Sequence, residues 1–167
     1  FGGRPCKMAE ISKLSRKFGF KIIEDASHAL GAKLNNRNIG DCYYSSMTVF
    51  SFHPVKNITT GEGGVVTTNS KSLSDKLRIL RTHGINKIRK KFITKKAPPW
   101  FFEQVSLGYN YRMNDIEAAL GISQLRKIKI FINKRNLVAK MYNAKLSNLP
   151  IVTPKEDNNI LNPYHLY

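Results

Sequence analysis

The apolar positions of this chain follow first a helical and then an extended period, which predicts an α/β succession of elements. Residues 5–18 carry apolar side chains at helical spacing, and Gly19 follows as a C-cap. Residues 20–24 are a short apolar run that predicts a buried strand. This strand delivers Asp25 to its carboxyl end, where ligands gather in open α/β sheets. Asp25 is therefore a candidate site residue.

The later elements continue this alternation. Two asparagines tolerate a left-handed turn, so they predict a small hairpin between residues 32–34 and 37–40. β-branched and aromatic runs predict strands at 47–52 and 64–68, on either side of a loop. We also expect a helix at 70–80, a basic loop ending at 98–99, a helix capped at 114–115 and a helix at 127–146. The order of elements favours an α/β layer with a mainly parallel sheet.

Length and composition fit one ordinary globular core. The chain has 167 residues, and 41% of them are hydrophobic. It opens on Phe-Gly-Gly and closes on an apolar Tyr-His-Leu-Tyr run, so we expect it to be the middle of a longer protein, cut through structure at both ends. Its apolar runs are shorter than the roughly 20 residues of a membrane span, which predicts a soluble protein. Cys6 and Cys42 lack disulfide or metal-site spacing and suit reduced thiols in the cytoplasm.

The net charge of +17 raises the possibility of a nucleic-acid partner, because clustered Lys and Arg neutralise phosphates. The 28 basic residues are scattered, however, with one dense cluster between Lys87 and Lys96 and no nucleic-acid-binding motif beside it. A solvated basic face is therefore the favoured interpretation, with no specific nucleic-acid partner. A non-catalytic basic binding module stays open as an alternative.

The main chemical signal is Lys56, within the run Ser-Phe-His-Pro-Val-Lys-Asn-Ile-Thr-Thr-Gly-Glu-Gly-Gly at residues 51–64. A single lysine in so basic a chain is usually a surface charge. Here a hydroxyl, Ser51, lies five residues before it, and the carboxylate of Asp25 lies upstream. A lysine with a hydroxyl five residues before it and a carboxylate further upstream suits an enzyme that uses pyridoxal phosphate. The glycines form a turn and not a dinucleotide fingerprint.

Five stretches of the chain together resemble the DegT/StrS-type sugar aminotransferases, which are fold-type I pyridoxal phosphate enzymes. They are residues 22–32, 50–64, 82–84, 108–115 and 164–167, in the same order and at comparable spacing. Within that family the first two are most similar to the UDP-sugar 4-aminotransferases of pseudaminic acid biosynthesis. The resemblance implies the large domain of a fold-type I transferase, truncated at both ends: residues 1–125 would be its central part, and residues 126–167 a connecting helix and the start of a small domain.

The resemblance also implies roles for individual residues. Lys56 is expected to form an imine with pyridoxal phosphate and to act as the proton-shuttling base. Asp25 would pair with the pyridine nitrogen, and His28 would lie beside the ring and its 3-hydroxyl. Ser51 would bind the phosphate, as would Asn110, which is expected to reach the cofactor of the other subunit across a dimer interface.

Two further residues are expected to contact substrate, and no metal ligands are expected. Arg112 lies in the same loop as Asn110, and His165 lies in the terminal motif. Arg112 suits a salt bridge before a helix equally well.

The activity implied by the resemblance is transfer of an amino group from glutamate to the 4-keto carbon of a nucleotide-linked deoxysugar, with UDP as the expected nucleotide. The expected enzyme is a cytoplasmic homodimer with shared active sites, serving bacterial surface glycan or flagellar sugar synthesis. A sugar dehydratase of the same family is an alternative, but there histidine replaces the lysine, so Lys56 argues against it. An inactive fragment is another, because the phosphate-holding helix and the stacking aromatic of relatives would precede Phe1.

Overall fold

The computed structural model describes residues 1–86, 92–94 and 96–167. Most of the basic cluster predicted between Lys87 and Lys96 therefore lies outside the described residues. The chain forms two compact units, which are described one at a time: residues 1–69 with 114–167, and residues 70–113. The sequence predicts a boundary between a large and a small domain after residue 125. This boundary does not coincide with the division into compact units, and it stays a prediction.

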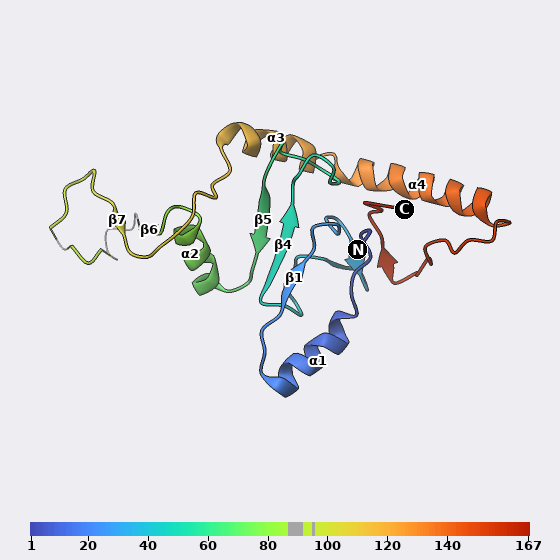
Figure 1. The fold of residues 1–167 in the computed structure, drawn as a ribbon, viewed down its shortest axis with the longest axis horizontal. Coiled ribbons are helices and arrows are strands. Elements are labelled where there is room, and N and C mark those ends of the chain that lie inside the picture. Colours follow the sequence, from blue (N-terminus) through green and yellow to red (C-terminus); the bar gives the residue numbers. More distant parts are fainter. Residues whose placement is uncertain (87–91, 95) are drawn as a thin grey trace. The chain divides into compact units, whose positions relative to one another are not determined.

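The central sheet of the first unit has the strand order β1-β4-β5 (Figure 1). Strand β1, Ile23–Asp25, runs parallel to β4, Met47–Ser51, and β4 pairs antiparallel with β5, Gly64–Thr67. Along β4 the side chains alternate between half-buried and buried, as expected for a strand covered on one face. The expected α/β fold is confirmed, whereas parallel pairing occurs, among the described strands, only between β1 and β4.

The predicted hairpin is confirmed and belongs to a second small sheet. Its strands are β2, Lys33–Leu34, and β3, Arg37–Asn38. The two residues between them, Asn35 and Asn36, have φ angles of 50° and 62°, the left-handed region that asparagine tolerates. The other edge of β2 pairs with β8, Ile160–Leu161, so the end of the chain returns to its first third.

Helix α1, Met8–Phe18, ends as predicted at Gly19, whose φ of 74° is a left-handed C-cap. Helix α3, Asp115–Leu125, starts at a capping box in which Asn114 and Glu117 exchange hydrogen bonds of 2.9 Å. Helix α4, Ile128–Leu146, is a separate helix that follows at once. In Figure 1 the two follow one another beyond the end of the sheet that carries the β4–β5 loop.

Helices α3 and α4 both approach the loops of the central sheet at glycines. Gly121 in α3 faces the side chain of Thr60 in the β4–β5 loop, where an added Cβ would lie 2.8 Å from the threonine methyl. Gly31, after β1, lies against Ile132 of α4. The segment after β1 and strand β4 together form a buried cluster of Ala26, Ala29, Ala32 and Phe50. The helices therefore rest on the segments that follow β1 and β4.

The second unit contains α2, Lys71–Leu80, with β6, Ile85–Asn86, and β7, Glu103–Gln104. Ser70 caps α2, because its hydroxyl accepts a hydrogen bond from the Leu73 amide, and the helix predicted at 70–80 is confirmed. No helix of the described residues is long and apolar enough to cross a membrane.

Candidate active site

Asp25 lies at the carboxyl end of β1, where the chain turns away from the sheet. The next amide, that of Ala26, still donates to Val49 of β4 at 2.8 Å, so the end of the strand is anchored. The Ser27 hydroxyl and amide both donate to Asp25 Oδ1, at 2.6 and 3.0 Å. These two hydrogen bonds lower the pKa of Asp25, with smaller contributions from His28 and from the positive charge of Lys56, and burial opposes them only in part. Asp25 is therefore a carboxylate at neutral pH.

Lys56 lies half-buried in the loop between β4 and β5. Its amide donates to the carbonyl of His53 at 2.9 Å. The loop is closed at its base by Phe52, whose carbonyl accepts from the Thr60 amide and the Thr59 hydroxyl, both at 3.0 Å. Parallel pairing of β1 with β4 brings the carboxyl ends of the two strands, and hence Asp25 and the lysine loop, to the same edge of the sheet.

His28 lies near Asp25 and Lys56, and its ring packs at a tilt against the ring of His165. The ring centroids are 4.3 Å apart, at an interplanar angle of 46°. Burial, and then the charge of Lys56, lower the pKa of His28. Burial also lowers the pKa of His165 to about 4, with further contributions from His28, Lys56 and Arg135. Both rings are consequently neutral at pH 7. The structure thus brings Asp25, Lys56, His28 and His165 together from segments far apart in the sequence.

Ser51 is the last residue of β4 and marks the start of the lysine loop. Its hydroxyl accepts a long hydrogen bond, 3.4 Å, from the His53 amide. The hydroxyl remains free to donate its proton to an anion.

Asn110 and Arg112 belong to the second unit, so the structure does not group them with Lys56. Asn110 forms an isolated β-bridge with Thr82, and the neighbouring amide of Tyr111 donates to Arg81 at 3.0 Å. Both Asn110 and Arg112 are exposed. Their roles across a dimer interface or at a substrate stay predictions.

The side chains of the first unit fit pyridoxal phosphate. A protonated pyridine nitrogen needs a carboxylate, and both hydrogen bonds from Ser27 end on Oδ1 of Asp25, which leaves Oδ2 to accept from a ligand. Lys56 supplies an amine, and the neutral ring of His28 supplies a flat surface. Within residues 1–86, 92–94 and 96–167, no group of three or more His, Cys, Asp or Glu is placed to hold a metal ion.

Several hydrogen bonds near Lys56 and His165 could not be predicted from the residues adjacent to them in the sequence. Arg135 of α4 donates to the carbonyl of Tyr164 at 2.9 Å and so holds the segment that carries His165. Asn57, next to Lys56, donates to the carbonyl of Pro163 at 3.3 Å. These residues border a groove of about 520 Å³ beside α4. Each contact joins positions 29 or more residues apart.

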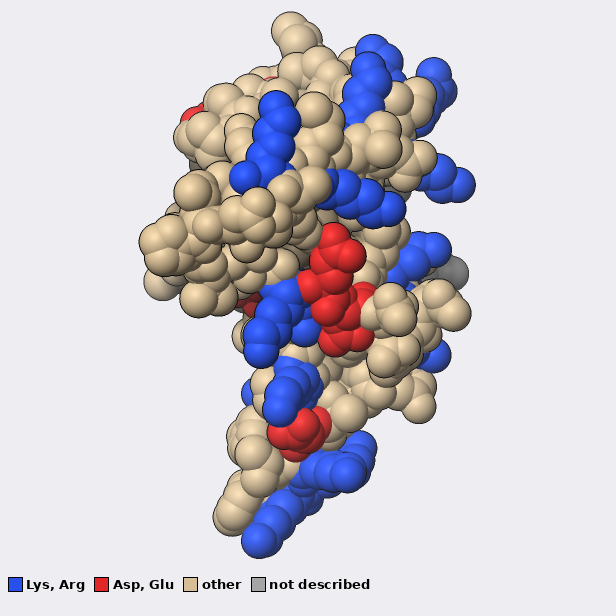
Figure 2. All heavy atoms as spheres, turned by 90° about the vertical axis from the view of Figure 1, so that its right-hand side faces the viewer, with Lys and Arg blue, Asp and Glu red and all other residues tan. Residues whose placement is uncertain are grey.

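The basic side chains do not form one continuous surface on the face shown in Figure 2. Lys and Arg lie in separate groups there, with a group of Asp and Glu side chains between them (Figure 2). This distribution agrees with the scatter of basic residues in the sequence.

Comparison with known proteins identifies one family over the whole chain. The sequence model of the DegT/DnrJ/EryC1/StrS aminotransferase family matches residues 1–167. The UDP-4-amino-4,6-dideoxy-N-acetyl-beta-L-altrosamine transaminase of Campylobacter jejuni is 39% identical over 173 residues, covering 100% of this chain and 43% of its own length. An uncharacterized protein of Methanocaldococcus jannaschii is 42% identical, with coverage of 100% and 43%.

A solved structure gives the same result at the level of the fold. Helicobacter pylori PseC, described as an aminotransferase involved in the biosynthesis of pseudoaminic acid, superposes with a TM-score of 0.87 at 34% identity. The superposition covers 100% of this chain and 42% of that protein. The chain thus spans about two fifths of the length of the relatives it matches.

Proposed function

Since the chain belongs to the DegT/DnrJ/EryC1/StrS aminotransferase family, we propose that it is part of a pyridoxal phosphate-dependent enzyme that transfers an amino group from glutamate to the 4-keto carbon of a UDP-linked deoxysugar. The observation that carries the proposal is that Lys56, Asp25 and His28 lie near one edge of the sheet, close enough for the charge of Lys56 to lower the pKa of both other residues. The names of the Campylobacter and Helicobacter relatives support the choice of substrate.

Lys56 and Asp25 carry the chemistry in this proposal. When bound, pyridoxal phosphate supplies a conjugated ring that accepts electrons as a bond at the donor's α-carbon breaks. Lys56 supplies the amine that would hold the cofactor and, once released, would take the proton from that carbon and deliver it to C4′ of the cofactor. The carboxylate of Asp25 keeps the pyridine nitrogen protonated, which makes the ring a better electron acceptor.

The remaining side chains bind and orient. The neutral ring of His28 packs beside the cofactor without adding a second positive charge to it. The hydroxyl of Ser51 donates to the phosphate, and Asn110 does so from the other subunit of a homodimer. Arg112 and His165 contact the sugar nucleotide.

The proposal places this chain within a larger cytoplasmic protein of surface glycan or flagellar sugar synthesis. Residues 1–125 form part of the cofactor-binding domain, and residues 126–167 connect it to a smaller domain. A homodimer with shared sites follows from the role given to Asn110.

Transfer of a nitrogen label tests the function directly. The full-length protein, loaded with pyridoxal phosphate, is incubated with ¹⁵N-glutamate and a UDP-linked 4-keto deoxysugar. We expect ¹⁵N in the amino sugar and an equal amount of 2-oxoglutarate, and neither product with Lys56→Ala. Lys13→Ala, which changes an exposed lysine of α1, is the matched control and should retain the activity. A cofactor-loaded protein that labels no 4-keto sugar would overturn the proposal.

A further inference from the structure

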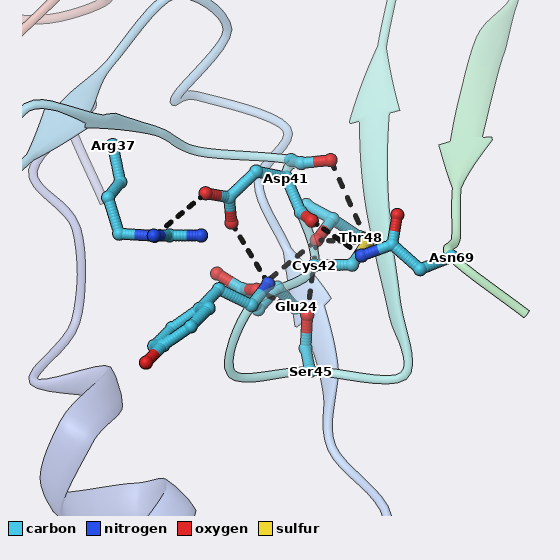
Figure 3. A network of polar contacts seen from close by, with 9 residues as sticks. Glu24, Arg37, Asp41, Cys42, Ser45, Thr48 and Asn69 are labelled. Carbon is cyan, nitrogen blue, oxygen red and sulfur yellow. Dashed lines mark hydrogen bonds and ion pairs between the residues drawn. The ribbon is translucent and has the colours of Figure 1, made fainter.

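Glu24, the residue before Asp25, faces away from the candidate site and enters a network of hydroxyl groups. Successive side chains of a strand point to opposite faces of a sheet, so Glu24 and Asp25 diverge. Oε1 of Glu24 accepts from the Ser45 hydroxyl at 2.5 Å and from the Thr48 hydroxyl at 3.2 Å. Figure 3 shows these side chains converging beneath β1 and β4.

The hydroxyl groups are themselves held in place. Thr48 is fully buried and lies opposite Glu24 in the register of β1 and β4. Its hydroxyl is 3.5 Å from the buried thiol of Cys42, which donates to the carbonyl of Thr67 in β5 at 3.2 Å. The carboxylate is thus linked directly to the adjacent strand β4 and, through Thr48 and Cys42, to β5 beyond it.

A frame of further contacts fixes the loop that supplies Ser45. Asp41 forms an ion pair with Arg37 at 3.0 Å and accepts from the Tyr43 amide at 2.9 Å. Its carbonyl accepts from the Asn69 side chain at 2.9 Å (Figure 3). The loop is therefore tied to the hairpin on one side and to the end of β5 on the other.

A half-buried carboxylate needs a physical reason at this position, because an apolar side chain would hold two strands together without the desolvation of a charge. Strand β1 has only three residues, so few backbone bonds fix it on β4. Hydrogen bonds to a charged acceptor are stronger and more directional than neutral ones. Two such hydrogen bonds at Glu24 restrict movement of β1 along its axis and rotation about it, one residue before Asp25.

We infer that Glu24 is a positioning residue for Asp25: through Ser45 and Thr48 it sets where the Asp25 carboxylate meets the cofactor's ring nitrogen. This inference rests on the proposed function.

A double-mutant cycle tests it, with the dissociation constant for pyridoxal phosphate as the measured quantity. In the full-length protein, Glu24→Met should weaken cofactor binding about tenfold, or about 1.4 kcal/mol. In an Asp25→Asn background the same change should weaken binding less than twofold, because no carboxylate is left to position. Glu24→Gln, which keeps an acceptor, should restore most of the affinity, and Glu10→Met, on the exposed surface of α1, should have no effect.

Amide hydrogen exchange in the cofactor-free protein supplies a second readout. Glu24→Met should speed exchange at Ala26 and Ser27, whose amides bond to Val49 and Asp25. Ser45→Ala, a milder change, should do the same to a smaller extent and serves if Glu24→Met does not fold.

The outcomes separate this inference from the proposed function. Equal loss of affinity in both backgrounds, or unchanged exchange at Ala26 and Ser27, would overturn the positioning role while leaving the function intact. A wild-type protein that binds no pyridoxal phosphate would overturn both.

Discussion

Replacing Gly31 by alanine should destabilise the first unit more than an ordinary glycine substitution does. Gly31 has a φ of 81°, a left-handed angle that costs an L-residue about 1–2 kcal/mol. An added Cβ would also overlap the tip of Ile132, which is 4% exposed and cannot move into solvent. Overpacking of this kind costs about 1–3 kcal/mol. Alanine also lowers the conformational entropy of the unfolded chain, which offsets about 0.4–1 kcal/mol of this loss. The expected net loss in the free energy of unfolding is about 1–4.6 kcal/mol.

A matched glycine separates the two contributions. Gly19 has a similar φ of 74°, but nothing lies within 4 Å of a Cβ built there. Gly19→Ala should therefore lose only the backbone contribution, and urea denaturation of the full chain should show Gly31→Ala to be less stable by about 1–3 kcal/mol. Equal losses for the two variants would refute the reasoning, because an alanine side chain at position 31 would then not clash with Ile132 of α4.

Three further predictions concern the site. Burial lowers the pKa of His165 to about 4 from its ordinary 6.5, so between these pH values the unfolded state binds more protons than the folded state. The free energy of unfolding, measured in denaturant titrations, should therefore fall as the pH drops from 6.5 to 4. His165→Phe should reduce that fall. Asp25→Asn should leave the circular dichroism spectrum unchanged and reduce kcat by orders of magnitude, since a neutral amide does not keep a ring nitrogen protonated; unchanged turnover would assign Asp25 to turn formation. Mixed dimers of Lys56→Ala and Asn110→Ala subunits should regain one working site each, and inactive verified heterodimers would exclude the shared site.

Features that depend on neighbouring residues were predictable from the sequence. The Asn35–Asn36 turn and the Asn114 cap follow from side chains that bond or tolerate conformations within a few residues. Strand β1 was placed slightly early: it starts at Ile23 and includes Asp25, because its limits are set by pairing with β4. The expectation of mainly parallel pairing does not hold for β5: residues 52–63 connect it to β4 without a helix, and the chain returns antiparallel instead of making the helical crossover that usually joins parallel neighbours.

Features that join distant parts of the chain were not predictable from local pattern. The pairing of β2 with β8 and the tilted contact between the rings of His28 and His165 join the first third of the sequence to its end. Glu24 carries no sequence signal beyond its place beside Asp25, because Ser45 and Thr48 resemble ordinary polar residues of a turn and a strand. The motifs around Lys56 and Asp25 identify both residues from the sequence, and the structure adds that the charge of Lys56 contributes to the lowered pKa of Asp25.

The most direct test of the central claim is reduction of the cofactor-loaded, full-length protein with borohydride, followed by peptide mass mapping. A covalent bond between Lys56 and pyridoxal phosphate should give one modified peptide, covering residues 51–64, with the cofactor mass on Lys56 and loss of the visible absorbance band. Lys56→Ala should abolish the modification. Stoichiometric label on another lysine, or the same label in Lys56→Ala, would contradict the assignment of Lys56 as the residue that holds the cofactor.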